Sequence, residues 1–197
     1  MASSSQRVTL GLTKPTLYGS PMQAAIRLAR ESDAEFLPAV ERSASEAFRT
    51  VDWLVGTADG AVLTAEVQRG FIRQGACWVA VDEPDEVVGF LTAEPCGDEL
   101  HVWELDVRLD RQRQGYGRAL VETAIGWAGR QGLTAVTLTT FRGIAWNEPF
   151  YARLGFATLR SDQLGDRLAV VLRRERGLGL PMDRRCAMRL GLTPPRR

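Results

Sequence analysis

Leu100–Val107 reads LHVWELDV, residues 111–118 read RQRQGYGR, and residues 147–156 read NEPFYARLGF. The first segment has an apolar strand pattern, and Gly115 and Gly117 stand between it and the helical pattern of residues 117–130. Glycines at a helix N-terminus let several backbone N–H groups approach one anion, and the helix dipole favours the same charge. We therefore predict a strand, an anion-binding loop and a helix in succession.

The two best-known glycine-rich phosphate loops do not fit this stretch. A dinucleotide fingerprint needs a third Gly or Ala where Leu120 stands, and a P-loop needs Gly-Lys followed by Ser or Thr. Neither pattern is present. A plain glycine turn before a helix is the remaining alternative. Residues 147–156, which follow the next strand, argue against it.

Outward from this stretch, strand and helix patterns alternate along the whole chain. A capping-box pattern, Ser32-x-x-Glu35, precedes helical spacing from Phe36 to Phe48, and a second short helix starts near Thr64 and packs Val67, Phe71 and Ile72. The remaining elements are strands at 25–28, 77–81, 87–93, 134–140, 156–159 and 185–190, a short helix after Asn147, and a helix at 164–175. We predict one α/β domain over residues 25–191, with tails at 1–24 and 192–197.

Composition narrows the function classes. Twenty-five Lys and Arg against 24 Asp and Glu give a net charge of +1, so we expect no nucleic-acid partner. Three cysteines without CxxC spacing and a single histidine argue against a metal site and for reduced thiols in the cytoplasm. No apolar run approaches the ~20 residues of a membrane span, so we expect no membrane partner.

With both motifs in view, the chain resembles the GCN5-related N-acetyltransferase (GNAT) superfamily. Gln112-x-x-Gly115-x-Gly117 is similar to its pyrophosphate-binding motif, and Asn147-x-x-x-Tyr151 with Leu154-Gly155-Phe156 is similar to its later motif. The resemblance implies a mixed, mostly antiparallel α/β sheet of about six to seven strands with flanking helices. It also implies acetyl-CoA as co-substrate, held by Leu105, Asp106, Val107, Gln112, Arg113, Gln114, Gly115, Tyr116, Gly117, Arg118, Asn147 and Phe150.

Within this resemblance, Tyr151 is the expected general acid. A phenol with a reference pKa of about 10 stays protonated and can give its proton to a departing thiolate. Asn147 is expected to contact the cofactor. It also suits an N-cap, because Pro149 follows in the first turn of the short helix.

The general base has two candidates on one strand. Strict alternation puts His101, Trp103, Leu105 and Val107 on one face and Val102, Glu104 and Asp106 on the other. His101 has a reference pKa of about 6.5 that suits proton removal. Glu104 becomes reachable if the strand bulges near Leu105, as strands of this superfamily commonly do. A water chain without a single base is the third possibility.

The acceptor is expected to be a primary amine, first of all on a small molecule. Trp53, Phe141, Arg142 and Trp146 are the candidate acceptor residues, with aromatic rings suited to an amine on an apolar body. A protein N-terminus or lysine side chain is the alternative acceptor, and a non-catalytic acyl-CoA sensor is the alternative class. Homodimers are common among relatives, so a homodimer is a further expectation.

Overall fold

The computed structural model describes residues 25–54, 62–82 and 84–193. These residues form a seven-stranded sheet with the order β1-β2-β3-β4-β5-β7-β6, in which β4 and β5 pair in parallel and the other neighbours are antiparallel. The predicted mixed, mostly antiparallel sheet is confirmed. The strands are β1 (Ala25–Leu28), β2 (Cys77–Asp82), β3 (Glu86–Cys96), β4 (Glu99–Val107), β5 (Ala135–Phe141), β6 (Ala157–Thr158) and β7 (Arg185–Gly191).

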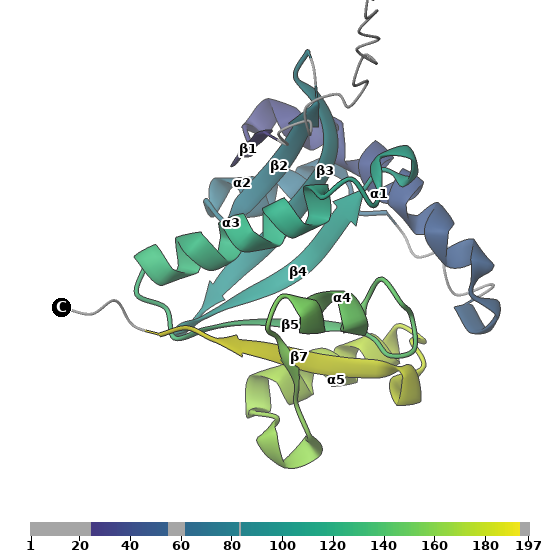
Figure 1. The fold of residues 1–197 in the computed structure, drawn as a ribbon, viewed down its shortest axis with the longest axis vertical. Coiled ribbons are helices and arrows are strands. Elements are labelled where there is room, and N and C mark those ends of the chain that lie inside the picture. The colour runs from purple at the N-terminus through teal and green to yellow at the C-terminus, as the bar shows by residue number, and fades with distance from the viewer. Residues whose placement is uncertain (1–24, 55–61, 83, 194–197) are drawn as a thin grey trace, which may run out of the picture.

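Helices cover both faces of this sheet (Figure 1). The first face carries α3 (Tyr116–Arg130) and α4 (Glu148–Arg153). The second carries α1 (Leu37–Ser45) and α2 (Ala65–Arg73), with α5 (Asp166–Gly177) against β7. None of the helices in the described ranges is long and apolar enough to cross a membrane. Short 3-10 turns complete the order: Glu31–Glu35, Glu46–Thr50, Asp52–Leu54, Leu109–Arg111, Ser161–Gln163 and Met182–Arg184.

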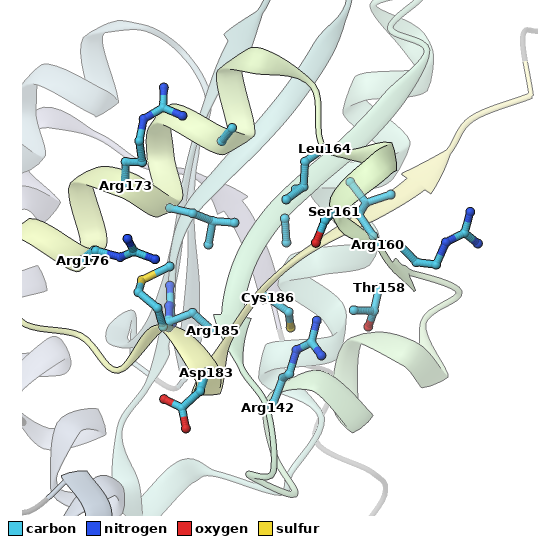
Figure 2. A pocket seen from close by; sticks show the side chains of 15 residues that line it. Arg142, Thr158, Arg160, Ser161, Leu164, Arg173, Arg176, Asp183, Arg185 and Cys186 are labelled. Carbon is cyan, nitrogen blue, oxygen red and sulfur yellow. The ribbon is translucent and has the colours of Figure 1, made fainter.

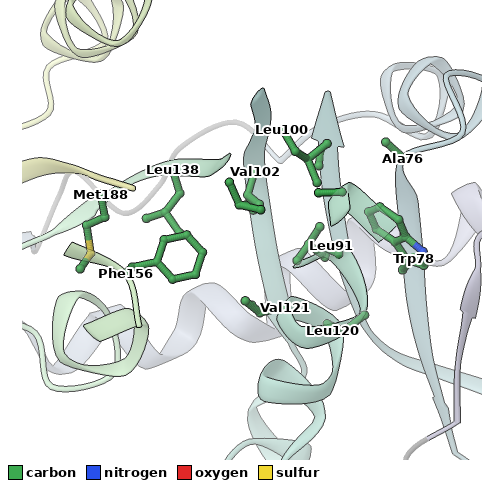
Figure 3. Packing of buried hydrophobic residues seen from close by; sticks show 14 of the residues in the cluster. Ala76, Trp78, Leu91, Leu100, Val102, Leu120, Val121, Leu138, Phe156 and Met188 are labelled. Carbon is green, nitrogen blue, oxygen red and sulfur yellow. The ribbon is translucent and has the colours of Figure 1, made fainter. Parts of the chain in front are cut away.

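The main hydrophobic core lies between the sheet and α3 (Figure 3). Leu120, Val121, Ala124 and Ala128 recur at helical spacing on α3, and all four are buried against the strands. Burying one leucine side chain contributes about 1.5–3 kcal/mol, so this stripe anchors the helix that begins at the glycine loop. A second core cluster, which includes Leu37, Ile72 and Phe90, holds α1 and α2 on the opposite face.

The predicted start of the first helix is wrong. Residues 31–35 form a 3-10 turn in which the backbone N–H of Arg30 donates to Asp33 Oδ2 at 2.6 Å, and α1 begins only at Leu37. Pro38 explains the later start, because proline has no N–H to donate and suits the first helical turn. The helix also ends at Ser45, before Phe48, and Phe36 is 58% exposed.

The predicted packing of α2 is wrong in one respect. Val67 is 47% exposed, whereas Gln68 and Ile72 are the buried residues of this helix. A polar side chain therefore occupies the apolar stripe. Gln68 points at β4 rather than at the hydrophobic core, and this contact bears on the candidate site.

A bulge in β4 overturns the predicted strict alternation. Thr92 on β3 pairs with Glu104, but the next residue, Ala93, pairs with Val102, so Trp103 is an extra residue on β4. Beyond the bulge, Leu105 and Val107 join Leu100 and Val102 in the core under α3. Glu104 is consequently turned toward α2 on the opposite face. The bulge expected near Leu105 is present two residues earlier.

The parallel pair β4–β5 opens partway along its length. Pairing runs from Glu99↔Ala135 to Val102↔Leu138 and then stops, while β5 continues its pairing with β7 to Phe141. Figure 1 shows β4 turning toward α1 while β5 and β7 run on together. Residues 103–107 of β4 therefore have no partner strand on the β5 side within the described part of the chain.

Gly89 on β3 supports this opened strand by close approach. A Cβ at position 89 would lie 2.9 Å from the backbone oxygen of Asp106 and 3.1 Å from Val107 Cγ2. Gly89→Ala is expected to lower the free energy of unfolding by about 1–3 kcal/mol, because the strands must separate to admit the methyl group. Urea unfolding measures the change. Gly70→Ala, at an open position on α2, is the control and should not destabilise; equal losses in both variants would contradict the packing argument.

Candidate active site

The glycine loop connects β4 to α3 and presents backbone N–H groups. Gly115 has φ +97° at the N-cap of α3, and Arg113 has φ +59°, an unusual left-handed conformation for a residue with a side chain. No backbone N–H of residues 113–118 donates a hydrogen bond within the described ranges. The first turn of a helix leaves such donors free, and alternating left-handed residues direct them into one concavity.

Two glutamine side chains of the glycine loop stabilise it by hydrogen bonds to the backbone of the preceding residues. Gln112 Nε2 donates to the carbonyl of Val107 at 3.0 Å, and Gln114 Nε2 donates to the carbonyl of Asp110 at 3.1 Å. Arg118 pairs with Glu122 along the helix, whereas Arg113 has no carboxylate partner among the described residues. Arg113 is thus the cation that the loop leaves available for an anion.

The second motif packs directly onto this loop. A Cβ at Gly117 would lie 3.8 Å from Phe150 Cζ and 3.8 Å from Val107 Cγ2, so the two helix starts and β4 meet there. Asn147 is the N-cap residue of α4 as predicted, but its side chain makes no capping hydrogen bond. The amide of Asn147 is therefore available to a ligand. The two sequence motifs, separated by about thirty residues, converge on the opened edge of β4.

Glu104 lies on this edge with a perturbed pKa. Gln68 Nε2 donates to Glu104 Oε2 at 3.1 Å, and Glu41 on α1 is close enough to act on its charge. Burial, with repulsion from Glu41, raises the pKa of Glu104 to about 7, while the hydrogen bond from Gln68 opposes the rise. A carboxyl with such a pKa can accept a proton near neutral pH.

Asp106 and Tyr151 lie beside each other in the same region. Burial, followed by the charges of Glu104 and Glu41, raises the pKa of Asp106 well above its usual range. Burial, followed by the charge of Asp106, raises the pKa of the Tyr151 phenol. The ring of Tyr151 packs against Phe150 at 5.0 Å and Phe156 at 5.8 Å between centroids. Tyr151 therefore keeps its proton across the neutral pH range.

His101 is placed differently from the other candidate base. It is fully buried, its Nδ1 lies 3.0 Å from Thr137 Oγ1, and Thr137 also accepts from Arg167 at 2.9 Å. Burial, followed by Arg167, lowers the pKa of His101 to about 3. The imidazole is thus neutral at all ordinary pH values and belongs to a network that ties β4, β5 and α5 together. Its Nε2 has no partner among the described residues.

The expected acceptor aromatics gather in one cluster. Phe141 at the end of β5 lies 5.5 Å from Trp53 and 6.0 Å from Phe48, and Trp146 lies 6.2 Å from Phe48, all between ring centroids. Trp146 is 45% exposed, so the cluster reaches the surface. Arg184 lies over the Trp53 ring at 5.3 Å, and Arg185 lies over the Phe141 ring at 4.5 Å.

Arg142 stands apart from this aromatic cluster. Its side chain lines a different cavity together with Thr158 and Cys186 (Figure 2). Arg142 directly follows Phe141, the last residue of β5, and its side chain lines this cavity instead of joining the aromatic rings with which it was predicted.

Three residues near Glu104 and the aromatic cluster were missed from the sequence. Glu41 and Gln68 are polar residues on the inward sides of α1 and α2, and Arg185 reaches back from β7. A polar residue at helical spacing with buried neighbours, as at Gln68 and Ile72, was the available signal. No set of three or more His, Cys, Asp and Glu side chains in the described chain is arranged to hold a metal.

Comparison with known proteins now decides the family. Residues 37–156 match the profile described as the Acetyltransferase (GNAT) family, and a curated relative aligns over most of its own length. This chain belongs to the GNAT acetyltransferase family. That relative of the GNAT chain is the peptidyl-lysine N-acetyltransferase YjaB of Salmonella typhimurium, 33% identical over 148 residues, which cover 74% of this chain and 91% of YjaB.

More distant matches agree with this family. The GNAT chain is 29% identical over 83 residues, 39% of its length, to the N-acetyltransferase family 8 member 3 of Mus musculus, and it spans 37% of that relative. The fold matches the PaiA N-acetyltransferase of Thermoplasma acidophilum, solved in complex with coenzyme A, with a TM-score of 0.66. That match has 14% identity and covers 87% of this chain and 100% of the other.

Proposed function

We propose that this GNAT protein transfers an acetyl group from acetyl-CoA to a primary amine by direct attack in a ternary complex. One observation carries the proposal: the unpaired edge of β4 bears Glu104, whose pKa is about 7, and Asp106, whose charge acts on Tyr151. Attack of an amine on a thioester has four requirements: a deprotonated amine, in-line positioning, a hydrogen-bond donor for the oxyanion, and an acid that protonates the departing thiolate. This arrangement has a candidate for each.

In this proposal acetyl-CoA binds along the glycine loop and the unpaired edge of β4. The free N–H groups of residues 113–118 and the Arg113 guanidinium suit the pyrophosphate, and the Asn147 amide suits the pantetheine arm. The backbone of residues 105–107 then pairs with that arm as an added strand would. The N–H of Leu105 is the proposed oxyanion donor. Coenzyme A in the Thermoplasma acidophilum structure supports this choice of cofactor.

Glu104 is the proposed general base, in preference to His101. A carboxylate with a pKa of about 7 is half ionised at neutral pH and can take a proton from an incoming ammonium. His101, with a pKa of about 3 and no exposed surface, lacks both the basicity and the access. Tyr151 is the proposed acid that protonates the departing CoA thiolate, since its phenol remains protonated.

A small-molecule amine is the preferred acceptor. The cluster of Phe48, Trp53, Phe141 and Trp146 offers apolar ring surface that reaches solvent at Trp146, which suits the apolar body of a compact amine. A lysine side chain of a protein is the second candidate, and the peptidyl-lysine activity named for YjaB favours it. The free cysteines support a cytoplasmic location. A homodimer stays a prediction.

An assay of thiol release from acetyl-CoA tests the proposed function. The purified chain is offered small aromatic and aliphatic amines in one arm and lysine-containing or free N-terminal peptides in the other. Acetylated product with release of one thiol per acetyl group is expected, fastest with a primary alkylamine that carries an aromatic ring. Tight CoA binding without release in either arm would overturn catalysis in favour of a sensor. Faster release with peptides would overturn the acceptor class alone.

Gln68→Leu is expected to shift the pH dependence of acetyl transfer. The hydrogen bond from Gln68 lowers the pKa of Glu104, so its loss raises that pKa further, by about one unit. The rising limb of the pH–rate profile then moves to higher pH, and activity recovers in alkaline buffer. Gln74→Leu, the same substitution at the exposed C-cap of α2, is the control. Identical profiles for both variants would remove Gln68 from the mechanism.

A further inference from the structure

A cavity lies at the β7–β6 edge of the sheet. Its volume is about 840 Å³, within the ~300–1,000 Å³ of small-molecule sites. Its walls come from α5, from the start of β7 and from the segment after β6 (Figure 2). Arginines dominate the polar lining: Arg142, Arg160, Arg173, Arg176 and Arg185.

Only some of these guanidinium groups are neutralised. Arg185 pairs with Glu175 at 2.6 Å, and Arg160 pairs with Asp162 at 3.0 Å. Arg142, Arg173 and Arg176 have no carboxylate partner among the described residues. Asp183, the carboxylate in the lining, lies 3.6 Å from Arg184 instead. The cavity therefore carries uncompensated positive charge.

The unpaired arginines approach the cavity from different walls. Figure 2 shows the guanidinium of Arg142 and that of Arg176 turned toward the middle, whereas the guanidinium of Arg160 points away. Arg142 directly follows the end of β5, and Arg173 and Arg176 stand one turn apart on α5. A planar guanidinium matches the two oxygens of a carboxylate or phosphate. Because Arg142 and the arginines of α5 lie on different walls of the cavity, the arrangement suits a ligand with two or more anionic groups.

The rest of the lining is apolar. Leucine, alanine and methionine side chains form it: Leu159, Leu164, Ala169, Leu172, Met182 and Ala187. Cys186 also faces this space but is 2% exposed, and burial raises the pKa of its thiol, so it stays neutral and does not act as a nucleophile. This apolar lining suits the carbon skeleton of an organic ligand that binds without forming a covalent bond.

We propose that this cavity binds a small organic anion with two or more carboxylate or phosphate groups. An amine acceptor is disfavoured there, since an ammonium ion would face the unpaired guanidiniums of Arg142 and Arg176, which carry the same charge. The cavity adjoins the aromatic cluster, because Arg185 lines it and also lies over the Phe141 ring at 4.5 Å. The inference does not depend on acetyl transfer, because none of the residues proposed to hold CoA or to move a proton lines the cavity.

Isothermal titration calorimetry with two probes tests the site. Citrate supplies carboxylates and fructose 1,6-bisphosphate supplies phosphates, each titrated at low ionic strength into the chain with and without excess CoA. Saturable one-to-one binding of at least one probe is expected, with the same affinity in both conditions. Displacement by CoA would place the probe in the glycine loop and overturn the proposal. Absence of saturable binding for both probes would also overturn it.

Variants locate the probe. The double variant Arg142→Gln/Arg176→Gln should weaken binding at least about tenfold, because both charge-assisted contacts to the anion are lost. Arg174→Gln, on the same helix but outside the lining, is the charge-matched control and should keep wild-type affinity. Equal weakening in the control would mean that the probe responds to net charge alone, against a defined site.

Discussion

Glu104→Gln is expected to lower kcat/KM for acetyl transfer by about 10²–10⁴-fold at pH 8. Glutamine keeps the size of the side chain and can still accept the hydrogen bond from Gln68, but it cannot take a proton. In the wild type, activity should rise as pH passes through about 7, because Glu104 must be ionised to act as base. The variant should lose this limb. Initial rates between pH 5.5 and 9 measure both effects.

The thermal stability of the Glu104→Gln variant shows whether its loss of activity comes from the missing base or from unfolding. The pKa of Glu104 is higher in the folded than in the unfolded chain. Its contribution to the free energy of unfolding therefore decreases as pH rises from the unfolded-state pKa of 4.5 to the folded-state pKa of about 7. Glu104→Gln should therefore unfold at an unchanged or higher temperature at pH 8. Glu94→Gln, a carboxyl on the neighbouring strand β3, is the control and should keep the pH limb. If His101→Asn removed the limb and Glu104→Gln kept it, the base assignment would be reversed.

Tyr151→Phe is expected to lower kcat by about 10²-fold or more while leaving CoA affinity unchanged. The ring contacts with Phe150 and Phe156 survive in phenylalanine, so only the proton donor is lost. Single-turnover measurements of thiolate release, together with CoA titrations, separate the chemical step from binding. An unchanged single-turnover rate would show that the leaving thiolate needs no acid from Tyr151.

The raised pKa of Tyr151 adds a second readout. Burial and the nearby Asp106 keep the phenol protonated, so wild-type kcat should show no decline from its ionisation between pH 7 and 9. Asp106, whose own pKa is raised, is the group that faces Tyr151 and is coupled to Glu104. A falling limb in this range that vanished in Tyr151→Phe would mean that the phenol titrates far more readily than its burial implies.

Much of the fold was predictable because local patterns and tertiary packing agree. The apolar stripe indicates α3, the continuous apolar run of residues 77–81 indicates β2, and Gly115 marks the start of α3. Two of the wrong predictions, the start of α1 and the facing of β4 residues, each have a local cause. Pro38 delayed the start of α1, and the bulge at Trp103 changed which residues of β4 face α3. A bulge leaves little trace in one strand, since it depends on how the partner strand pairs.

The stretch of residues 100–156 by itself determined the order of elements, the anion-binding loop and the family resemblance, because these depend on residue types at short spacing. Tertiary structure decided how the candidate bases differ. His101 and Glu104 are three residues apart, yet burial beside Arg167 lowers the pKa of one, and burial beside Glu41 raises that of the other. These shifts arise from desolvation and from charges on α1 and α5. Such neighbours are distant in sequence, so only the folded chain brings them together.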